Sequence, residues 1–181
     1  RPGGGRARRA RVPSGASAPG GGCAARPSVA AARVYPPSVV TLACRRAAAD
    51  WVERRLGATV DPATEVAAVV GSKEFVASTP QFLKLRDPSR DTVLYPAVSY
   101  PTYAMGATLA GCRAVSYRAL SDVSAEDAVR ALCVWVNTPG NPTGGLVDLP
   151  ATAAWGRRPA VPLLSDGCSA EFPWAGDPTT I

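Results

Sequence analysis

The sequence contains no histidine, and its five cysteines are scattered along the chain, at Cys23, Cys44, Cys112, Cys133 and Cys168. No two of them have the Cys-x-x-Cys spacing. Because histidine and paired cysteines are the usual ligands of zinc, we expect no metal site. An odd number of dispersed cysteines predicts reduced thiols and a cytoplasmic protein rather than a disulfide framework.

Lysine and long apolar runs are also scarce. The 181 residues include only two lysines, Lys73 and Lys84. No apolar stretch approaches the roughly 20 residues that a membrane span needs. No segment has the apolar centre of a secretory signal. The sequence therefore predicts no membrane partner.

Acidic residues are absent from the first 49 positions, which contain nine arginines, whereas residues 50–181 contain 11 basic and 14 acidic residues. Residues 1–34 consist mainly of Arg, Gly, Ala, Pro and Ser. Such a composition buries too little apolar surface to offset the entropy of ordering, so we expect a disordered tail. An arginine-rich tail is consistent with nucleic-acid binding or with an organellar transit peptide. We favour a third origin, spurious translation of GC-rich codons.

From residue 41 onwards, strand patterns alternate with helical patterns. Helices are expected over 41–56, 72–85, 100–110, 125–130 and 149–157, and strands over 65–70, 92–95, 113–117, 131–136 and 161–165. This alternation is typical of an α/β fold, a three-layer α/β/α domain with a mainly parallel sheet.

The most informative segment is the octet Asn-Thr-Pro-Gly-Asn-Pro-Thr-Gly at residues 137–144. It directly follows residues 131–136, a nearly all-apolar run that predicts a strand covered on both faces. A second apolar run ends in Asp166. In open α/β sheets, ligands bind beyond the carboxyl ends of the strands. An amide and a carboxylate on adjacent strand ends suit a heteroaromatic ligand with an oxygen and a ring nitrogen.

The octet, followed by an apolar run that ends in Ser165-Asp166, resembles the class I/II aminotransferases, which are fold type I enzymes dependent on pyridoxal phosphate. The resemblance covers residues 35–181. Since the family is roughly twice as long as this chain, it implies a partial cofactor-binding large domain, truncated at both ends. Gly71-Ser-Lys-Glu74 and Tyr100-Pro-Thr-Tyr103 are most similar to the bacterial N-succinyldiaminopimelate aminotransferases. The implied activity is transfer of an amino group from an amino acid to a 2-oxo acid such as 2-oxoglutarate, in a homodimer.

Gly71, Ser72 and Lys73 are expected where a strand meets a helix. Free N–H groups and the helix dipole make such a junction favourable for an anion. The order Gly-Ser-Lys is not that of a Walker A loop, and Ser72 is equally consistent with a simple helix N-cap. The resemblance implies that these three residues hold the cofactor phosphate and that Tyr100 stacks on the cofactor ring, with Tyr103 as the second candidate. The alternative is that both tyrosines pack against the sheet.

The resemblance also assigns three polar residues near the two strand ends. It implies that Asn141 donates a hydrogen bond to the phenolic oxygen of the cofactor and that Asn137 ties the loop together. Asp166 is implied to pair with the pyridinium nitrogen, which keeps the ring an acceptor of electrons. The alternative for Asp166 is an exposed carboxylate without a ligand.

The sequence departs from the family pattern at several positions. Tyr35 precedes Arg45 with the family's spacing, which implies that Tyr35 reaches the phosphate of the neighbouring subunit, but Val40 replaces the usual glycine. Gly167 and Ser169 stand where the family has an acidic residue and a tyrosine. The serine is too short to replace the tyrosine hydroxyl.

The largest departure is the missing catalytic lysine. Transamination needs a lysine that forms a Schiff base with the cofactor and shuttles a proton. Lys73 lies in the phosphate turn, Lys84 lies on a helix, and neither follows Asp166. We therefore expect this chain to form part of a cofactor-binding site without a catalytic residue. Alone, the chain is expected to be inactive in transamination. Two alternatives stay open: another fold type I enzyme, such as a carbon–sulfur lyase or a decarboxylase, and a non-catalytic protein whose basic tail binds nucleic acid.

Overall fold

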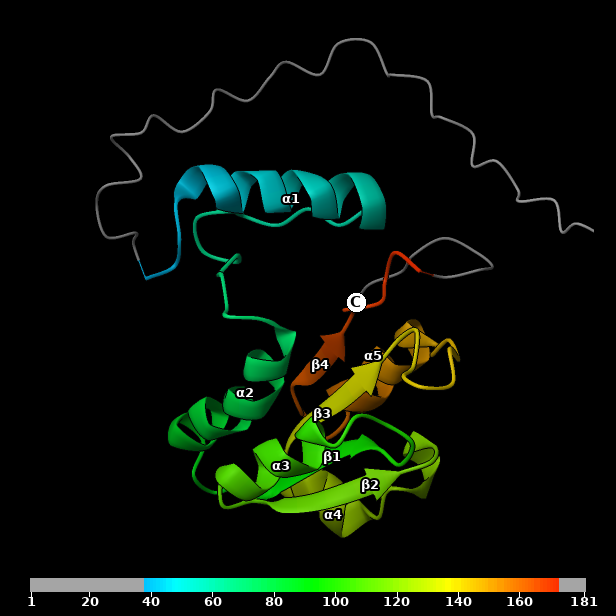
Figure 1. The fold of residues 1–181 in the computed structure, drawn as a ribbon. Coiled ribbons are helices and arrows are strands. Elements are labelled where there is room, and N and C mark those ends of the chain that lie inside the picture. The colour runs from blue at the N-terminus through cyan, green and yellow to red at the C-terminus, as the bar shows by residue number, and fades with distance from the viewer. Residues whose placement is uncertain (1–37, 173–181) are drawn as a thin grey trace, which may run out of the picture. The chain divides into compact units, whose positions relative to one another are not determined.

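The computed structural model describes residues 38–172, so the expected tail at 1–34 and Tyr35 lie outside the described residues. The elements, in chain order (Figure 1), are α1 (Leu42–Leu56), α2 (Ser72–Arg86), β1 (Thr92–Pro96), α3 (Thr102–Leu109), β2 (Arg113–Tyr117), η2 (Leu120–Asp122), α4 (Ala125–Arg130), β3 (Ala131–Asn137), α5 (Leu149–Arg157) and β4 (Leu163–Asp166). No helix of this part of the chain is long and apolar enough to cross a bilayer.

The four strands form one parallel sheet in the order β2-β1-β3-β4. All seven residues of β3 are buried, as expected of a strand with neighbours on both sides and helices on both faces. Asn137 at the end of β3 pairs in register with Asp166 at the end of β4. The predicted α/β class with a parallel sheet is confirmed.

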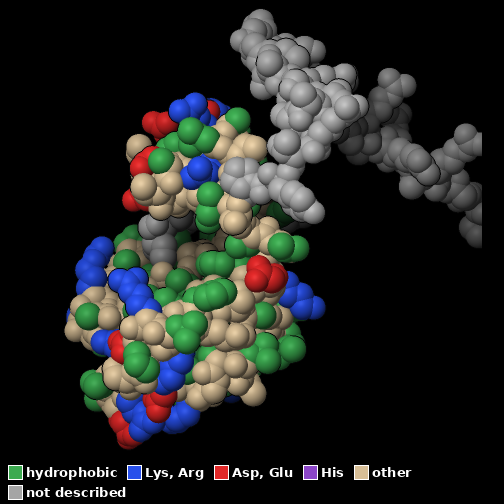
Figure 2. Space-filling model, turned by 90° about the vertical axis from the view of Figure 1, so that its left-hand side faces the viewer, with side chains coloured by type: hydrophobic (Ala, Val, Ile, Leu, Met, Phe, Trp, Pro, Cys, Tyr) green, Lys and Arg blue, Asp and Glu red, His purple; other side chains and the backbone are tan. Residues whose placement is uncertain are grey.

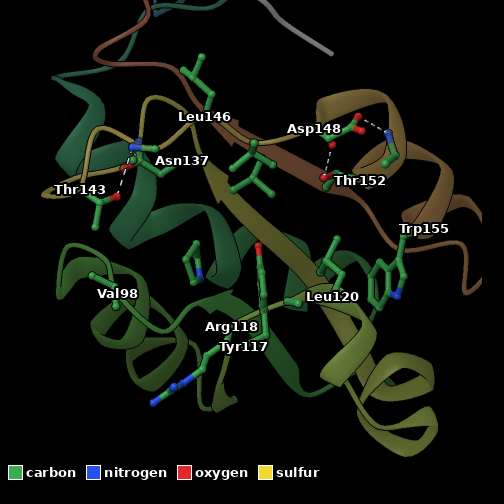
Figure 3. Close-up of a pocket in the computed structure, with 17 residues that line it drawn as sticks. Val98, Tyr117, Arg118, Leu120, Asn137, Thr143, Leu146, Asp148, Thr152 and Trp155 are labelled. Atoms are coloured by element: carbon green, nitrogen blue, oxygen red, sulfur yellow. Dashed lines mark hydrogen bonds between the residues drawn. The ribbon is translucent and has the colours of Figure 1, made fainter. Parts of the chain in front are cut away.

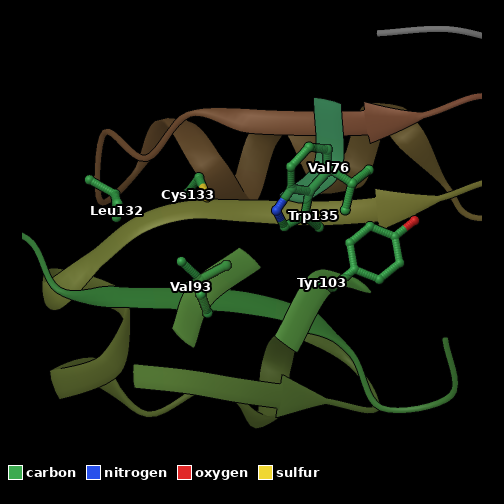
Figure 4. Packing of buried hydrophobic residues seen from close by; sticks show 7 residues of the cluster. Val76, Val93, Tyr103, Leu132, Cys133 and Trp135 are labelled. Atoms are coloured by element: carbon green, nitrogen blue, oxygen red, sulfur yellow. The ribbon is translucent and has the colours of Figure 1, made fainter. Parts of the chain in front are cut away.

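Two hydrophobic clusters lie on opposite faces of the sheet. Alternate residues of β3 supply them, Cys133 and Trp135 to one face and Val134 to the other. The first cluster packs under α2 and α3 (Figure 4) and contains Val76, Val93, Tyr103, Ala107, Leu132, Cys133 and Trp135. The second lies under η2 and α5, where Leu120 and Trp155 pack against it. The described domain is therefore built of three layers.

Helices α2 and α3 approach closely at Gly106. A Cβ atom added there would lie 2.8 Å from the carbonyl oxygen of Val76 and 3.2 Å from the Cα of Ala77. Only a residue without a side chain allows this contact. Seen from the side of α2, exposed apolar side chains lie between charged ones on the surface (Figure 2); Phe82 and Leu85 of this helix are among the exposed apolar residues.

The prediction of a strand over residues 65–70 is wrong. Residues 61–65 form a turn in which the N–H of Glu65 donates to the carbonyl of Asp61 at 2.8 Å. The following residues pair with no strand of the described sheet, and Val70 is 93% exposed. A strand needs a neighbour to satisfy its backbone N–H and C=O groups, so an apolar pattern alone does not form one.

Helix α1, at Leu42–Leu56, begins one residue after the expected start at residue 41 and is capped at both ends. The hydroxyl of Thr41 accepts a hydrogen bond from the N–H of Cys44, and Gly57 ends the helix in the left-handed conformation. Val40, immediately before the N-cap, has a φ of 63°. This value lies in the region that favours glycine, the residue that the resemblance expects at this position. The guanidinium of Arg45 donates to the carbonyls of Pro62 and Ala63.

Candidate functional site

A pocket of about 220 Å³ lies beside the carboxyl ends of β3 and β4 and the start of α2. Its lining residues are Ser72, Lys73, Val76, Tyr100, Thr102, Tyr103, Asn137, Asn141, Asp166 and Cys168. Five of the seven residues predicted to bind a ligand are among them, namely Ser72, Lys73, Tyr100, Asn141 and Asp166. Gly71 directly precedes this set, and Tyr35 lies outside the described residues. The pocket is where parallel strands of an open sheet place their ligands.

The start of α2 presents unpaired backbone donors to this pocket. Gly71, with a φ of 108°, is the N-cap, and no side chain caps the helix. The first backbone bond of the helix runs from the N–H of Phe75 to the carbonyl of Gly71 at 3.2 Å. Ser72 therefore occupies the first helical position, and the alternative that it is the N-cap is wrong. The N–H groups of this first turn remain available for an anion.

Lys73 and Tyr100 lie together at the pocket rim. The ammonium of Lys73 is 5.7 Å from the centre of the Tyr100 ring, within the range of a cation–π contact. Tyr100 is 45% exposed and lines the pocket. This corner therefore provides both a positive charge and an aromatic surface.

Asp166 is held by hydrogen bonds to both of its carboxylate oxygens. The hydroxyl of Tyr103 donates to Oδ2 at 2.7 Å, and the N–H of Cys168 donates to Oδ1 at 3.1 Å. A carboxylate accepts about four hydrogen bonds, so acceptor positions remain. Burial and the bond to Asp166 raise the pKa of the Tyr103 phenol far above its usual value. The phenol therefore stays protonated and acts as the donor.

Asn137 ties the octet to the neighbouring strand, as the sequence predicts. Its side-chain nitrogen donates to the carbonyl oxygen of Asp166 at 2.9 Å, and its side-chain oxygen accepts the N–H of Asn141 at 2.7 Å. Within residues 38–172, the side-chain amide of Asn141 itself makes no hydrogen bond and lines the pocket. Ser169 does not line it.

Sequence reasoning missed the role of Tyr103 and the presence of Cys168. Tyr103 was a second candidate for stacking on a ligand, but its ring is buried against Trp135, with the ring centres 5.5 Å apart. No sequence signal distinguished the two tyrosines: Tyr100 precedes α3, whereas Tyr103 lies in its first turn. The other lysine, Lys84, donates to the carbonyls of Pro88 and Arg90 at 2.8 and 2.7 Å.

A second, larger pocket of about 460 Å³ lies on the other side of the octet, toward α5 (Figure 3). Its walls include Tyr117, Leu120, Leu146 and Trp155. Asp148 at its edge is engaged as the N-cap of α5. Although this pocket is larger, it lacks the phosphate turn, the ring and the strand-end carboxylate, so the smaller pocket is the stronger candidate site.

Comparison with known proteins identifies the family. The family model described as aminotransferase class I and II matches residues 28–156. The chain is 37% identical over 150 residues to 4-dedimethylamino-4-oxo-anhydrotetracycline transaminase OxyQ of Streptomyces rimosus, covering 81% of this chain and 40% of the relative. It is 42% identical over 123 residues to LL-diaminopimelate aminotransferase of Desulforudis audaxviator, covering 63% of this chain and 31% of that relative.

Solved structures agree. The substrate-bound BacF structure from Bacillus subtilis has a TM-score of 0.74 and 25% identity, over 81% of this chain and 40% of its own. A probable N-succinyldiaminopimelate aminotransferase from Thermus thermophilus has a TM-score of 0.68 and 28% identity, over 77% of this chain and 40% of its own. The names of these relatives differ in substrate, so the finer likeness to N-succinyldiaminopimelate enzymes stays a prediction. The chain spans about 40% or less of the length of these relatives, and it belongs to the class I and II aminotransferase family.

Proposed function

We propose that this chain is part of the pyridoxal phosphate cradle of an aminotransferase. One observation carries the proposal: a phosphate-type turn, an exposed aromatic ring, an amide and a strand-end carboxylate, distant in sequence, line one pocket. The donor set fits the chemistry of the cofactor that the family uses. The N-terminus of α2 and Lys73 suit a phosphate dianion, and Asp166 suits a protonated ring nitrogen.

In this proposal each side chain has a distinct task. Gly71, Ser72 and Lys73 bind the phosphate through backbone N–H groups and the ammonium. Tyr100 covers one face of the ring. Asn141 donates to the phenolic oxygen, and Asp166 keeps a proton on the ring nitrogen. The bound cofactor supplies the electron sink that transamination needs.

For the whole protein we propose transfer of an amino group between an amino acid and a 2-oxo acid in a cytoplasmic homodimer. As the finer substrate class we propose a diaminopimelate derivative such as N-succinyldiaminopimelate, with 2-oxoglutarate as acceptor. The support is that LL-diaminopimelate and N-succinyldiaminopimelate aminotransferases are among the proteins similar to this chain. Assays of the complete gene product with these donors and with a tetracycline-type amine test the proposal. Preference for the tetracycline-type amine would contradict it.

Cofactor binding by the chain itself is tested by fluorescence titration with pyridoxal phosphate. Asp166→Ala is expected to weaken binding by about 1.5–3 kcal/mol, because it removes a charge-assisted hydrogen bond. Asn141→Ala removes a neutral contact and is expected to cost about 0.5–1.5 kcal/mol. Ser169→Tyr is expected to be neutral or favourable, because it restores a hydroxyl that the family has. Unchanged binding by Asp166→Ala would show that the cofactor lies elsewhere.

A further inference from the structure

We propose that Tyr103 is a positioning residue of this site. Its buried hydroxyl fixes the carboxylate of Asp166 in the orientation in which the carboxylate accepts a hydrogen bond from a protonated ring nitrogen. The inference rests on the proposed function and adds Tyr103 to it. The hydroxyl of Tyr103 bonds Asp166 and does not contact the ligand. Its basis is the 2.7 Å bond from the Tyr103 hydroxyl to Oδ2 of Asp166.

The core, rather than the pocket rim, determines where this hydroxyl lies. Tyr103 is 1% exposed, and its ring packs at 48° against the fully buried indole of Trp135. It stands in the first turn of α3, which is pressed against α2 at Gly106. Figure 4 shows the ring beside Val76 and Trp135, with its hydroxyl pointing away from them. A donor held in this way has little rotational freedom to lose when it binds its acceptor.

Asp166, by contrast, depends on its neighbours for its orientation. The residue is only partly buried, at the end of the edge strand β4. Without the Tyr103 hydroxyl, the N–H of Cys168 at 3.1 Å would be the only donor among residues 38–172 to hold the carboxylate, and it belongs to the turn after the strand. Two donors, one per oxygen, fix the plane of the carboxylate. The remaining acceptor positions then point in defined directions.

The contact also acts on charge. The phenol is a neutral donor to Oδ2 of Asp166, so the other acceptor positions of the carboxylate remain open to a second donor. Burial and the bond to Asp166 raise the pKa of Tyr103, so the phenol does not lose its proton in competition with the ligand. Tyr103 therefore favours ligands with a positive, proton-bearing ring nitrogen over ligands of the same shape that lack it.

The test compares pyridoxal phosphate with its 1-deaza analogue, in which a C–H group replaces the ring nitrogen. Both affinities are measured for the 181-residue chain and for three variants. The unchanged chain should prefer pyridoxal phosphate about tenfold or more, as expected for a charge-assisted hydrogen bond. Tyr103→Phe should reduce this preference to within about threefold, and Asp166→Asn should remove it.

Tyr117→Phe is the matched control. Tyr117 is partly buried, and its hydroxyl donates to the carbonyl of Trp135 at 2.7 Å, but it lines the other pocket. This variant should keep the preference for pyridoxal phosphate. If Tyr103→Phe weakens both ligands equally and leaves the preference unchanged, Tyr103 is merely structural and the inference is wrong. If the unchanged chain binds neither ligand, the proposed function fails instead.

If Tyr103→Phe does not fold, the role of Tyr103 is tested by a measurement on the unchanged chain. The hydroxyl proton of a buried, hydrogen-bonded tyrosine exchanges slowly enough to be followed by proton NMR. Pyridoxal phosphate should shift the Tyr103 hydroxyl resonance, because its acceptor then also binds the ring nitrogen. The 1-deaza analogue should leave it in place. Equal shifts with both ligands would overturn the role of Tyr103.

Discussion

The side-chain amide of Asn137 donates to the backbone carbonyl of Asp166 at 2.9 Å and fastens the end of β3 to the end of β4. The same side chain accepts the N–H of Asn141 at 2.7 Å. Because Asn137 is only 5% exposed, water does not replace these bonds when they are lost. One buried side chain thus holds both the octet and the backbone of Asp166 in place.

Asn137→Ala should therefore destabilise the fold. It leaves the N–H of Asn141 without its partner and the carbonyl of Asp166 with only the 3.4 Å bond from the N–H of Thr138. We expect this to lower the free energy of unfolding by about 1–3 kcal/mol. Asn137→Asp retains the acceptor but loses the donor, so an intermediate loss is expected. Urea unfolding followed by circular dichroism measures both. Asn141→Ala, at an exposed position, is the control and should change stability by less than about 0.5 kcal/mol.

Gly106→Ala should also destabilise the domain, by opening the contact between α2 and α3. The added methyl would lie 2.8 Å from the carbonyl oxygen of Val76, and backbone cannot move aside as a flexible side chain does. Overpacking of this kind costs about 1–3 kcal/mol. Gly145→Ala is the matched control, because its nearest atom is the Thr143 hydroxyl at 3.4 Å. Equal melting temperatures for the two variants would contradict the predicted close contact.

Val40→Gly should stabilise the start of α1. Val40 has a φ of 63°, and the left-handed conformation costs a residue with a side chain about 1–2 kcal/mol. Glycine avoids this strain but loses about 0.5–1 kcal/mol through backbone entropy, so a net gain of a few tenths to about 1 kcal/mol is expected. Hydrogen exchange of the first-turn amides of α1 reports this gain. Val39→Gly, at a neighbouring exposed position, should slightly reduce protection instead.

Much of the fold follows from sequence periodicity because most of its elements are locally determined. The bounds of β2, α4 and α5 match the expected ranges, and α1 begins one residue after its expected start. Residues 65–70 have the same apolar pattern as the real strands. They remain without a partner strand, and that information lies in the tertiary arrangement rather than in the segment.

The candidate site was partly predictable for a similar reason. Parallel strands bring their carboxyl ends to one edge, so residues 137–141 and Asp166 had to lie near each other. The contact between Tyr103 and Asp166 was not predictable, because it depends on the direction in which the first turn of α3 projects its side chains. Whether the pocket residues bind the cofactor stays a prediction that the titrations decide.

The acid sensitivity of the domain should depend in part on Asp91. Arg130 donates from Nε to Oδ1 of Asp91 at 2.9 Å and also pairs with Oδ2. This pairing lowers the pKa of Asp91 below its ordinary value of 3.8, so the contribution to stability is complete above that value and is lost as the pH falls through the folded-state pKa. The difference in unfolding free energy between the unchanged chain and Asp91→Asn should be constant above about pH 5 and shrink below about pH 4. A difference that grows on acidification would contradict the assignment.

The 181-residue chain should form no stoichiometric Schiff base with pyridoxal phosphate. Lys84 is held by the carbonyls of Pro88 and Arg90 in the turn after α2. Lys73 lies over the Tyr100 ring at the start of α2, where the proposal assigns it to the phosphate rather than to the aldehyde.

Borohydride reduction of the mixture, followed by peptide mapping, measures this directly. Labelling should be substoichiometric and should be shared between Lys73 and Lys84, as for solvent-exposed amines of any protein. Lys73→Arg should retain most of the non-covalent affinity, because the guanidinium also binds phosphate. One mole of label on a single lysine, with the absorbance band of a Schiff base, would contradict the prediction. If that lysine is Lys73, the orientation proposed for the cofactor would have to be reversed.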